Sequence, residues 1–161
     1  MIGITSEFAY SGDFINSLKT PYGTSSFAYG ESGTTRWLEL TDPLGQTERV
    51  EYRDQAPGIA FSDAQVPTGM SPIVNAYLYY RNSFYWDKKA FKDANGDYTK
   101  AHIYHFQHTV GLNSTSGILE SDKMSLESRV WRNYPGAPPA YGDTVTRVQA
   151  PGAGKFFSRA Q

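Results

Sequence analysis

The stretch RWLELTDPLGQTERVEY, residues 36–52, decides the fold of this chain. On both sides of its centre, branched or aromatic residues alternate with polar ones, as in a strand with one face in water. The centre, Asp42-Pro43-Leu44-Gly45, has the composition of a tight turn. Pro presets φ, Gly tolerates positive φ, and Asp accepts hydrogen bonds from nearby backbone. We therefore interpret Asp42 as a turn residue rather than a catalytic acid, and predict two antiparallel strands that meet at this corner.

The composition of the whole chain is typical of an all-β protein. Its 161 residues include 12 Tyr, 9 Phe and 3 Trp beside 15 Gly and 9 Pro. Aromatic residues favour strands, and Gly and Pro favour the turns between them. The length is sufficient for one domain with a core of its own.

The charge and the termini exclude several classes of function. With 15 basic and 16 acidic residues, the formal net charge is -1, which predicts no nucleic-acid partner. Cysteine is absent, so neither disulfides nor thiolate metal sites are expected. The N-terminal MIGITSEFAY lacks the basic and long apolar regions of a signal peptide. No window approaches the roughly 18 apolar residues of a membrane-spanning helix, so we expect no membrane insertion.

The strongest local hairpin signal is FKDANGDYTKAHIYHF, residues 91–106. Asn95-Gly96 between aromatic-rich runs is the preferred two-residue hairpin turn, because both central residues must tolerate positive φ. The pattern predicts arms over residues 82–94 and 97–108. No segment shows a sustained helical stripe with caps at both ends, so no helix is expected.

The rest of the chain predicts further strands and two irregular segments. Residues 117–121 and 126–134 read as another hairpin, whereas residues 55–73 read as a loop or insertion. We therefore divide the chain into a β-ribbon domain over residues 1–134 and a C-terminal part over residues 135–161. The C-terminal part is expected to contain a Pro/Gly linker, residues 135–143, and a last hairpin formed by residues 144–149 and 155–159.

The chain also contains an internal repeat. Superposing Gly23 on Gly45 gives a spacing of 22 residues, and each unit is a strand, a Gly corner and a second strand that ends on an aromatic residue. Tyr10, Tyr29 and Tyr52 are the aromatic residues at the strand ends.

This unit resembles the Tyr-Asp (YD) repeat of the rearrangement hotspot (RHS) family, in which a "tDplG" corner joins two strands and the second closes on Tyr. RWLELTDPLGQTERVEYRDQAPGI is similar to that repeat almost throughout. YYRNSFYWDKKAF, YTKAHIYHF and GILESDKMSLESRVWRNYPG resemble the stretch that follows such repeats in bacterial RHS proteins. The resemblance covers roughly residues 4–134.

The resemblance implies an antiparallel β-hairpin ribbon of RHS type, here a partial shell or an open curved sheet. It implies a non-catalytic, structural role in which the shell encapsulates or presents a toxin or other cargo, as in bacterial polymorphic toxins and type VI secretion. The implied partners are the rest of an RHS shell, a toxin cargo, or further copies joined through open strand edges. Export by a bacterial secretion system without a signal peptide, from the cytoplasm, is implied as well.

The chain departs from the family at two points. Full RHS shells are several times longer, and no separate toxin is expected after residue 134. The family's self-cleavage motif, Asp-Pro-x-Gly followed by Leu near the end of the shell, is not matched, because Gln46 follows Gly45 in the first third of the chain. No protease role is therefore carried over to Asp42.

Three histidines are the first alternative candidates for chemistry. His102, His105 and His108 are three residues apart. On a strand, the first and last would share a face about 20 Å apart, with His105 on the other face. Ligands of one metal ion must all lie about 2 Å from it, so this spacing predicts strand histidines and no metal site.

The segment DANGD is the second candidate, because Asp93, Asn95 and Asp97 match the first positions of a calcium-binding loop. An EF-hand would also need Gly and Glu where this chain has Tyr98 and Tyr104. We expect no cofactor here and interpret Asn95-Gly96 as a turn only.

Two other function classes remain as alternatives. The first is a carbohydrate-binding β-module in which Tyr85 and Trp86, with Tyr77 and Tyr79, stack on sugar rings. The second is a small hydrolase that uses surface acids or the histidines, although the spacing of the acids selects no pair and no catalytic residue is assigned. The acids concerned are Glu39, Glu48, Glu51, Glu120, Asp122 and Glu127.

Overall fold

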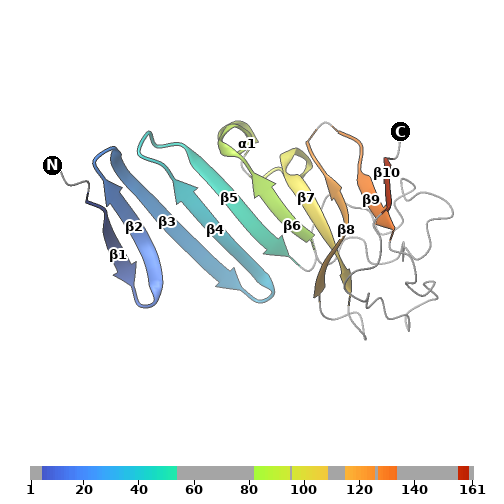
Figure 1. Ribbon diagram of the computed structural model, residues 1–161, viewed down its shortest axis with the longest axis horizontal. Helices are drawn as coiled ribbons and strands as arrows, with labels where there is room; N and C mark the ends of the chain where they lie inside the picture. The colour runs from blue at the N-terminus through green and yellow to red at the C-terminus, as the bar shows by residue number, and fades with distance from the viewer. Residues whose placement is uncertain are drawn as a thin grey trace.

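The computed structural model describes residues 5–53, 82–94, 96–108, 115–125, 127–133 and 156–159, which form one open antiparallel sheet (Figure 1). Each strand pairs with its neighbours in the sequence, so the strand order follows the chain. The prediction of an all-β, open curved sheet built from hairpins is confirmed. The strands are β1 (Glu7–Ser11), β2 (Phe14–Thr20), β3 (Gly23–Ser32), β4 (Thr35–Thr41), β5 (Thr47–Arg53), β6 (Asn82–Trp86), β7 (His102–His108), β8 (Thr115–Lys123), β9 (Val130–Asn133) and β10 (Phe156–Arg159).

The hairpin expected around Asn95-Gly96 differs from the prediction. Strands β6 and β7 do pair, but β6 ends at Trp86, and the helix α1 (Lys88–Ala94) and the 3-10 turn η1 (Tyr98–Lys100) follow before β7. The expectation of no helix is therefore wrong. Gly96 has φ of 85° and lies at the exit from α1, not in a two-residue hairpin turn, while Asn95 lies outside the described residues.

Helix α1 begins at Lys88 because the preceding residue, Asp87, caps its N-terminus. The Asp87 carboxylate accepts a hydrogen bond from the Ala90 N–H at 2.7 Å, and its carbonyl accepts one from the Phe91 N–H at 2.8 Å. Such a cap satisfies N–H groups that have no partner within the first turn. Seven residues are too few to show a helical stripe in the sequence.

The remaining predicted segments have mixed outcomes. Strands β8 and β9 pair as the second predicted hairpin, with Ser121 opposite Trp131, although the loop between them is longer than expected. The predicted last strand corresponds to β10, which pairs with β9. The predicted loop over 55–73, the linker over 135–143 and the strand over 144–149 lie outside the described residues.

The two Gly corners lie at the same end of neighbouring hairpins (Figure 1). A Cβ at Gly23, where φ is 125°, would lie 2.5 Å from Cβ of Pro43, so the first corner packs directly against the second. Their lengths differ, because Thr20 pairs with Gly23 whereas Thr41 pairs with Thr47. The repeat therefore sets the position of the corners, and each corner has its own turn.

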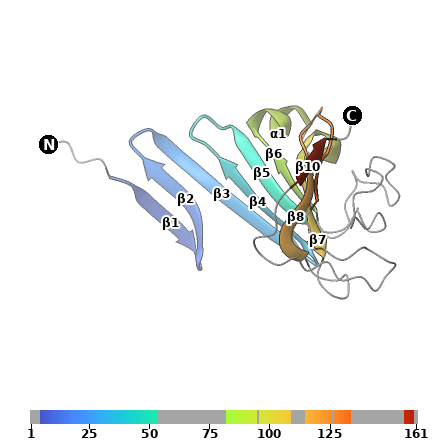
Figure 2. The same ribbon diagram turned by 45° about the vertical axis from the view of Figure 1, so that its right-hand side comes forward.

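The register gives the sheet two different faces. Trp37, Glu51 and Phe84 are cross-strand neighbours on one side, here called the core face. Tyr29, Leu38 and Val50 are neighbours on the other side, here called the open face. Helix α1 lies beside β5 and β6, and β1 and β2 lie at the far end of the sheet from it in both views (Figures 1 and 2).

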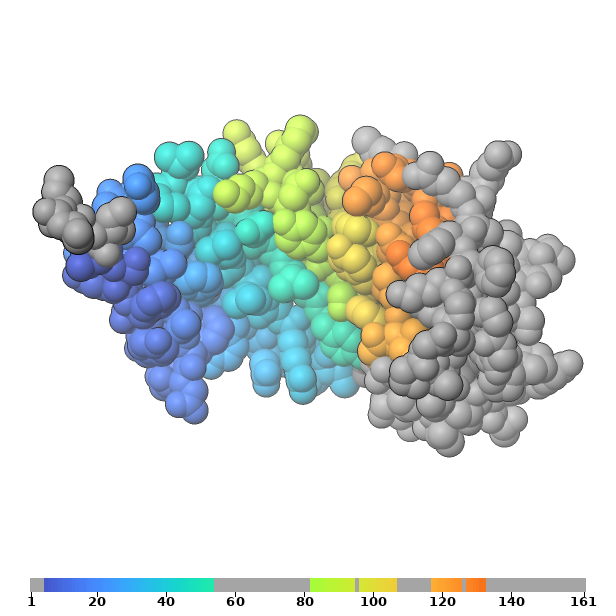
Figure 3. Space-filling model, viewed as in Figure 1, coloured from blue at the N-terminus to red at the C-terminus, as the bar shows by residue number. Residues whose placement is uncertain are grey.

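The hydrophobic core lies on the core face of β6–β9, beneath α1 and η1. Phe84, Trp86, Ala101, Ile103 and Trp131 are each at most 1% exposed. Ala90, Phe91 and Tyr98 pack against this cluster from α1 and η1. In the space-filling view, α1 follows the upper rim, and β1–β3 form the end of the molecule away from the core (Figure 3).

Candidate functional site

Polar side chains on the core face form a partly buried charged network across β4 and β5. The Arg49 guanidinium donates to Glu39 at 2.6 Å and to Glu51 at 2.7 Å, and lies 4.7 Å from the centre of the Trp37 ring. Glu51 is 5% exposed. Burial lowers the pKa of Arg49, but the two carboxylates outweigh it and raise that pKa, so the side chain stays charged. Gly30 leaves room for the indole, since a Cβ there would lie 2.5 Å from Trp37.

Tyr98 extends this network from η1 to the sheet. Its hydroxyl donates to Glu51 at 2.7 Å and accepts from the Arg53 guanidinium at 2.5 Å. Burial, followed by the hydrogen bond to Glu51, raises the pKa of Tyr98 and keeps the hydroxyl protonated. The network therefore fixes η1 on the sheet and leaves both acids engaged with protein partners.

Asp42 occupies the corner that opened the sequence analysis. One carboxylate oxygen accepts from the N–H groups of Leu44 and Gln46, each at 2.9 Å, and the other accepts from the Lys88 ammonium at 2.6 Å. The hydrogen bond from Lys88 is the main cause of the lowered pKa of Asp42, and the backbone bonds add to it. Asp42 thus holds the corner and anchors α1, in agreement with the turn interpretation.

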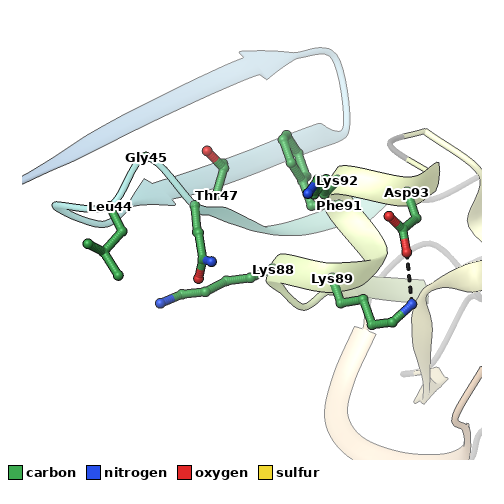
Figure 4. Close-up of a pocket in the computed structure, with 9 residues that line it drawn as sticks. Leu44, Gly45, Thr47, Lys88, Lys89, Phe91, Lys92 and Asp93 are labelled. Carbon is green, nitrogen blue, oxygen red and sulfur yellow. Dashed lines mark hydrogen bonds and ion pairs between the residues drawn. The ribbon is translucent and has the colours of Figure 1, made fainter.

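A cleft of about 800 Å³ lies between this corner and α1 (Figure 4). Leu44 and Gly45 line one side, and lysines of α1 line the other. Within the cleft, Lys89 pairs with Asp93 at 2.8 Å, as the dashed line in Figure 4 marks. Two of its three lysines are therefore neutralised by neighbouring carboxylates, and little net charge remains to select a ligand.

The residues of the predicted calcium-like segment do not converge. Asp93 is turned to Lys89, and Asp97 accepts from the N–H and the hydroxyl of Thr99 at the start of η1. Across the described part of the chain, no group of three or more His, Cys, Asp or Glu side chains could hold a metal ion.

The histidines lie on different faces, as the strand period predicts. His102 is 3.3 Å from the Asp122 carboxylate on the open face and stacks on Tyr104. His105 is fully buried on the core face, with Nδ1 2.9 Å from the Asn82 amide oxygen and Nε2 3.5 Å from the Glu120 carboxylate. The side chain of His108 lies outside the described set.

The cluster around His105 is a feature that the sequence interpretation missed. Asn82 and Ser121 are its cross-strand neighbours, and Ser121 accepts a hydrogen bond from Arg129 at 3.1 Å. All these side chains are at most 1% exposed, so the cluster is part of the packed interior. No spacing in the sequence links these residues, because they come from three strands and a loop.

Of the remaining acids, Glu48 and Asp122 lie on the open face. Glu48 accepts from the Tyr85 hydroxyl at 2.6 Å, and Asp122 accepts from Arg132. Glu127 lies in the exposed loop after β8. Glu39, Glu48, Glu51, Glu120 and Asp122 are each engaged by a tyrosine, arginine or histidine, and within the described residues no two of them line a common cleft.

Tyr85 and Trp86, the candidates for sugar stacking, lie on opposite faces. Trp86 is 1% exposed, donates to the Asp97 carbonyl at 3.1 Å and contacts Tyr98, so its ring is unavailable to a ligand from solvent. Tyr85 is partly buried, and its hydrogen bond to Glu48 raises its pKa to about 12. Tyr77 and Tyr79 lie outside the described residues.

The open face of β1–β5 gathers several exposed apolar side chains. Phe8 is 53% exposed, Tyr29 55%, Leu38 38% and Val50 41%. Phe14 contacts Tyr29 with ring centres 4.2 Å apart. A shallow hollow of about 350 Å³ is lined by Phe14, Tyr29, Leu38 and Val50 and also by the charged residues Glu31 and Arg36. Large side chains of this kind, gathered on one surface, are typical of an interface rather than of a catalytic site.

Comparison with protein-family models, curated proteins and solved structures finds no match to this chain. Within the described residues, none of the helical segments has the length and hydropathy to cross a membrane. The site must therefore be interpreted from its own geometry.

Proposed function

We propose that the chain is a non-catalytic, structural segment of an RHS-type β-ribbon that encapsulates or presents a toxin or other cargo. The observation that carries the proposal is the position of the two Gly corners. They are 22 residues apart, lie at the same end of successive hairpins, and touch through Gly23 and Pro43. A ribbon of repeated hairpins needs such contacts, because each unit buries little surface alone.

The strand order supports the same function. A sheet in which every strand pairs only with its sequence neighbours can be extended at either end by another hairpin. Among the described strands, β1 and β10 are the outer ones and each pairs with one neighbour, and outer strands are the positions at which a sheet is extended by a further strand. The proposed partners are therefore the adjoining parts of a shell, its cargo, or another copy, in a bacterial toxin or secretion system.

The charged groups support a structural role. Arg49, Glu51 and Tyr98 connect β4, β5 and η1 to one another, and Asp42 connects a turn to α1. Each of these groups completes a contact within the fold. An ionic network on one face of a single sheet stiffens that sheet without requiring a second layer.

Co-expression with the products of the flanking coding sequences tests the proposal. We expect the chain to co-purify with them, and the cargo in that complex to resist a protease that digests the cargo alone. The matched control is the same complex after mild denaturation, in which the protection should disappear. Failure to co-purify with any neighbour, or a cargo digested as fast with the chain as without it, would contradict a role in a shell.

A further inference from the structure

The open face of β1–β5 presents a continuous apolar surface. Tyr29, Leu38 and Val50 are paired in register across β3, β4 and β5, so their side chains form one row. Phe27 and Leu40 form the adjacent row on the same face. Hydrophobic side chains in register across three strands normally pack against a second layer of structure, because the apolar side of a sheet is usually buried.

On the opposite face, small and polar side chains predominate over β2 and β3. Ser17, Ser26 and Thr41 are neighbours across β2, β3 and β4, followed by Ala28 beside Glu39. Over β2–β4 the open side carries most of the large apolar side chains, whereas on the other side Trp37 lies among small and polar residues. This difference decides which side a partner would cover.

The size of the surface reaches the lower limit for a specific protein–protein interface. Five strands about 4.8 Å apart, with about seven residues each at roughly 3.3 Å per residue, give a face of about 550 Å². Two such faces in contact remove about 1,100 Å², just above the roughly 1,000 Å² expected for a specific interface. An extended peptide laid on the same face would cover only one or two of the strands.

The charges favour a second copy as the partner. On the open face of β1–β5, Glu48 lies beside Leu40 and accepts a hydrogen bond from Tyr85, while the exposed charges Glu31 and Arg36 form an opposite pair at one end, 3.8 Å apart. In a two-fold dimer, Glu31 of one copy then faces Arg36 of the other, and Arg36 faces Glu31. The formal net charge of -1 adds almost no repulsion between copies.

We propose that two copies of this chain pack face to face through the open face of β1–β5, as two stacked sheets. Exposed aromatic side chains of one copy, such as Phe8, enter the hollow beside Tyr29 and Val50 of the other. Stacked sheets lie about 10 Å apart, which suits aromatic side chains that interdigitate. The inference goes beyond the proposed shell, whose neighbours join at strand edges and leave this face uncovered.

Sedimentation equilibrium of the full chain tests the proposal. We expect a dimer that dissociates on dilution, and a dissociation constant raised about 100-fold or more by Val50→Lys, because each copy would bury an unpaired ammonium against the other. Ser26→Lys places the same charge on the opposite face, where Ser26 is exposed, and should leave the dissociation constant within about threefold of the wild type. Circular dichroism of both variants shows whether they fold.

Thiol labelling gives a readout that does not depend on a charged variant. Because the chain has no cysteine, Val50→Cys and Ser26→Cys each introduce a single reactive group. The labelling rate at position 50 should fall as the protein concentration rises, while that at position 26 stays constant. A wild type that is monomeric up to its solubility limit overturns the proposal, as does an oligomer unaffected by Val50→Lys, which would be joined through strand edges. Neither result bears on cargo protection in the co-expression experiment.

Discussion

Removing the Tyr98 hydroxyl tests whether the charged network holds η1 on the sheet. The change Tyr98→Phe keeps the ring, which lies 4.6 Å from Phe84 and 5.4 Å from Trp86 between ring centres. It removes only the oxygen that joins Glu51 to Arg53. Any loss of stability then reports on the two hydrogen bonds and not on core packing.

The expected loss follows from how well water can replace each bond. The Glu51 side chain is 6% exposed, so its carboxylate has almost no access to water once the hydroxyl is gone. Arg53 is 35% exposed at its side chain and recovers part of its bond from solvent. A hydrogen bond to a charged group contributes about 1.5–3 kcal/mol, so we expect Tyr98→Phe to lower the free energy of unfolding by about 2 kcal/mol. At about 2–4 °C per kcal/mol for a chain of this size, Tm should fall by about 4–8 °C.

Denaturant and thermal unfolding, followed by circular dichroism, measure this loss. Tyr22→Phe is the matched control, because Tyr22 is 82% exposed and should change the free energy of unfolding by less than about 0.5 kcal/mol. In a Glu51→Gln background, the cost of Tyr98→Phe should shrink by about 1 kcal/mol, since the charged acceptor is already lost. Equal losses for Tyr98→Phe and Tyr22→Phe, or an unchanged cost in that background, would refute the reasoning.

Three further changes probe the open face and the corners. Glu48→Gln should lower the pKa of Tyr85 from about 12 toward 10.0 in an absorbance titration, because the hydrogen bond to Glu48 is the main cause of the raised value. Since that pKa is raised on folding, the contribution of Tyr85 to stability is complete below pH 10.0 and is lost as the pH rises to about 12, and the variant should reduce this loss. In denaturant unfolding, Asp42→Ala should be more destabilising than Asp42→Asn, because Asn keeps a side-chain oxygen that accepts the backbone hydrogen bonds of the corner. The pKa of Asp42 is lowered on folding, so the wild type should be more stable than Asp42→Asn above pH 3.8, and this difference should shrink as the pH falls below 3.8. Gly23→Ala should lower the free energy of unfolding by at least about 2 kcal/mol, and Gly12→Ala by about 1 kcal/mol. Both glycines have positive φ, but only at Gly23 would a Cβ collide with a neighbour, Pro43. Equal losses for the two variants would argue against contact between the corners.

The alternation of residues predicts the sheet well, because strand pairing repeats a local pattern. The run from Trp37 to Tyr52 predicts two strands and a corner, and the structure has β4, β5 and a turn held by Asp42. Helix α1 could not be predicted in the same way. Its seven residues follow the β6 pattern without a break, and its signals, the Asp87 cap and Gly96, also suit a hairpin.

The sequence also does not show which face of the sheet is covered. Trp37 and Leu38 are adjacent and both apolar, but only the side chain of Trp37 lies on the face that α1 and η1 share. That choice depends on where Tyr98 and Phe91 return to the sheet, which is a tertiary contact. For the same reason, the sequence indicates that the histidines separate but not that His105 meets Asn82 and Glu120.

The core face buries charged side chains beside its hydrophobic cluster, while the open face leaves apolar side chains exposed. Charged groups such as Glu51 and Arg129 are buried on the core side, while Leu38, Val50 and Tyr29 are exposed on the other. Burying charges is costly unless they are fully paired, and exposing apolar surface forgoes the main stabilising contribution to folding. A single copy buries charges and also leaves apolar surface in water. Two copies that pack through the open face would remove that apolar surface from water.

The stability of the wild type should therefore depend on protein concentration. A partner that binds only the folded chain adds to the free energy of unfolding by mass action, so Tm should rise as the concentration is raised above the dissociation constant. Val50→Lys removes the partner and not the fold, because Val50 is 41% exposed, and its Tm should stay constant over the same range. Ser26→Lys should follow the wild type. Thermal scans at several concentrations measure this directly, and a wild-type Tm that does not change with concentration would mean that each copy tolerates its exposed apolar face alone.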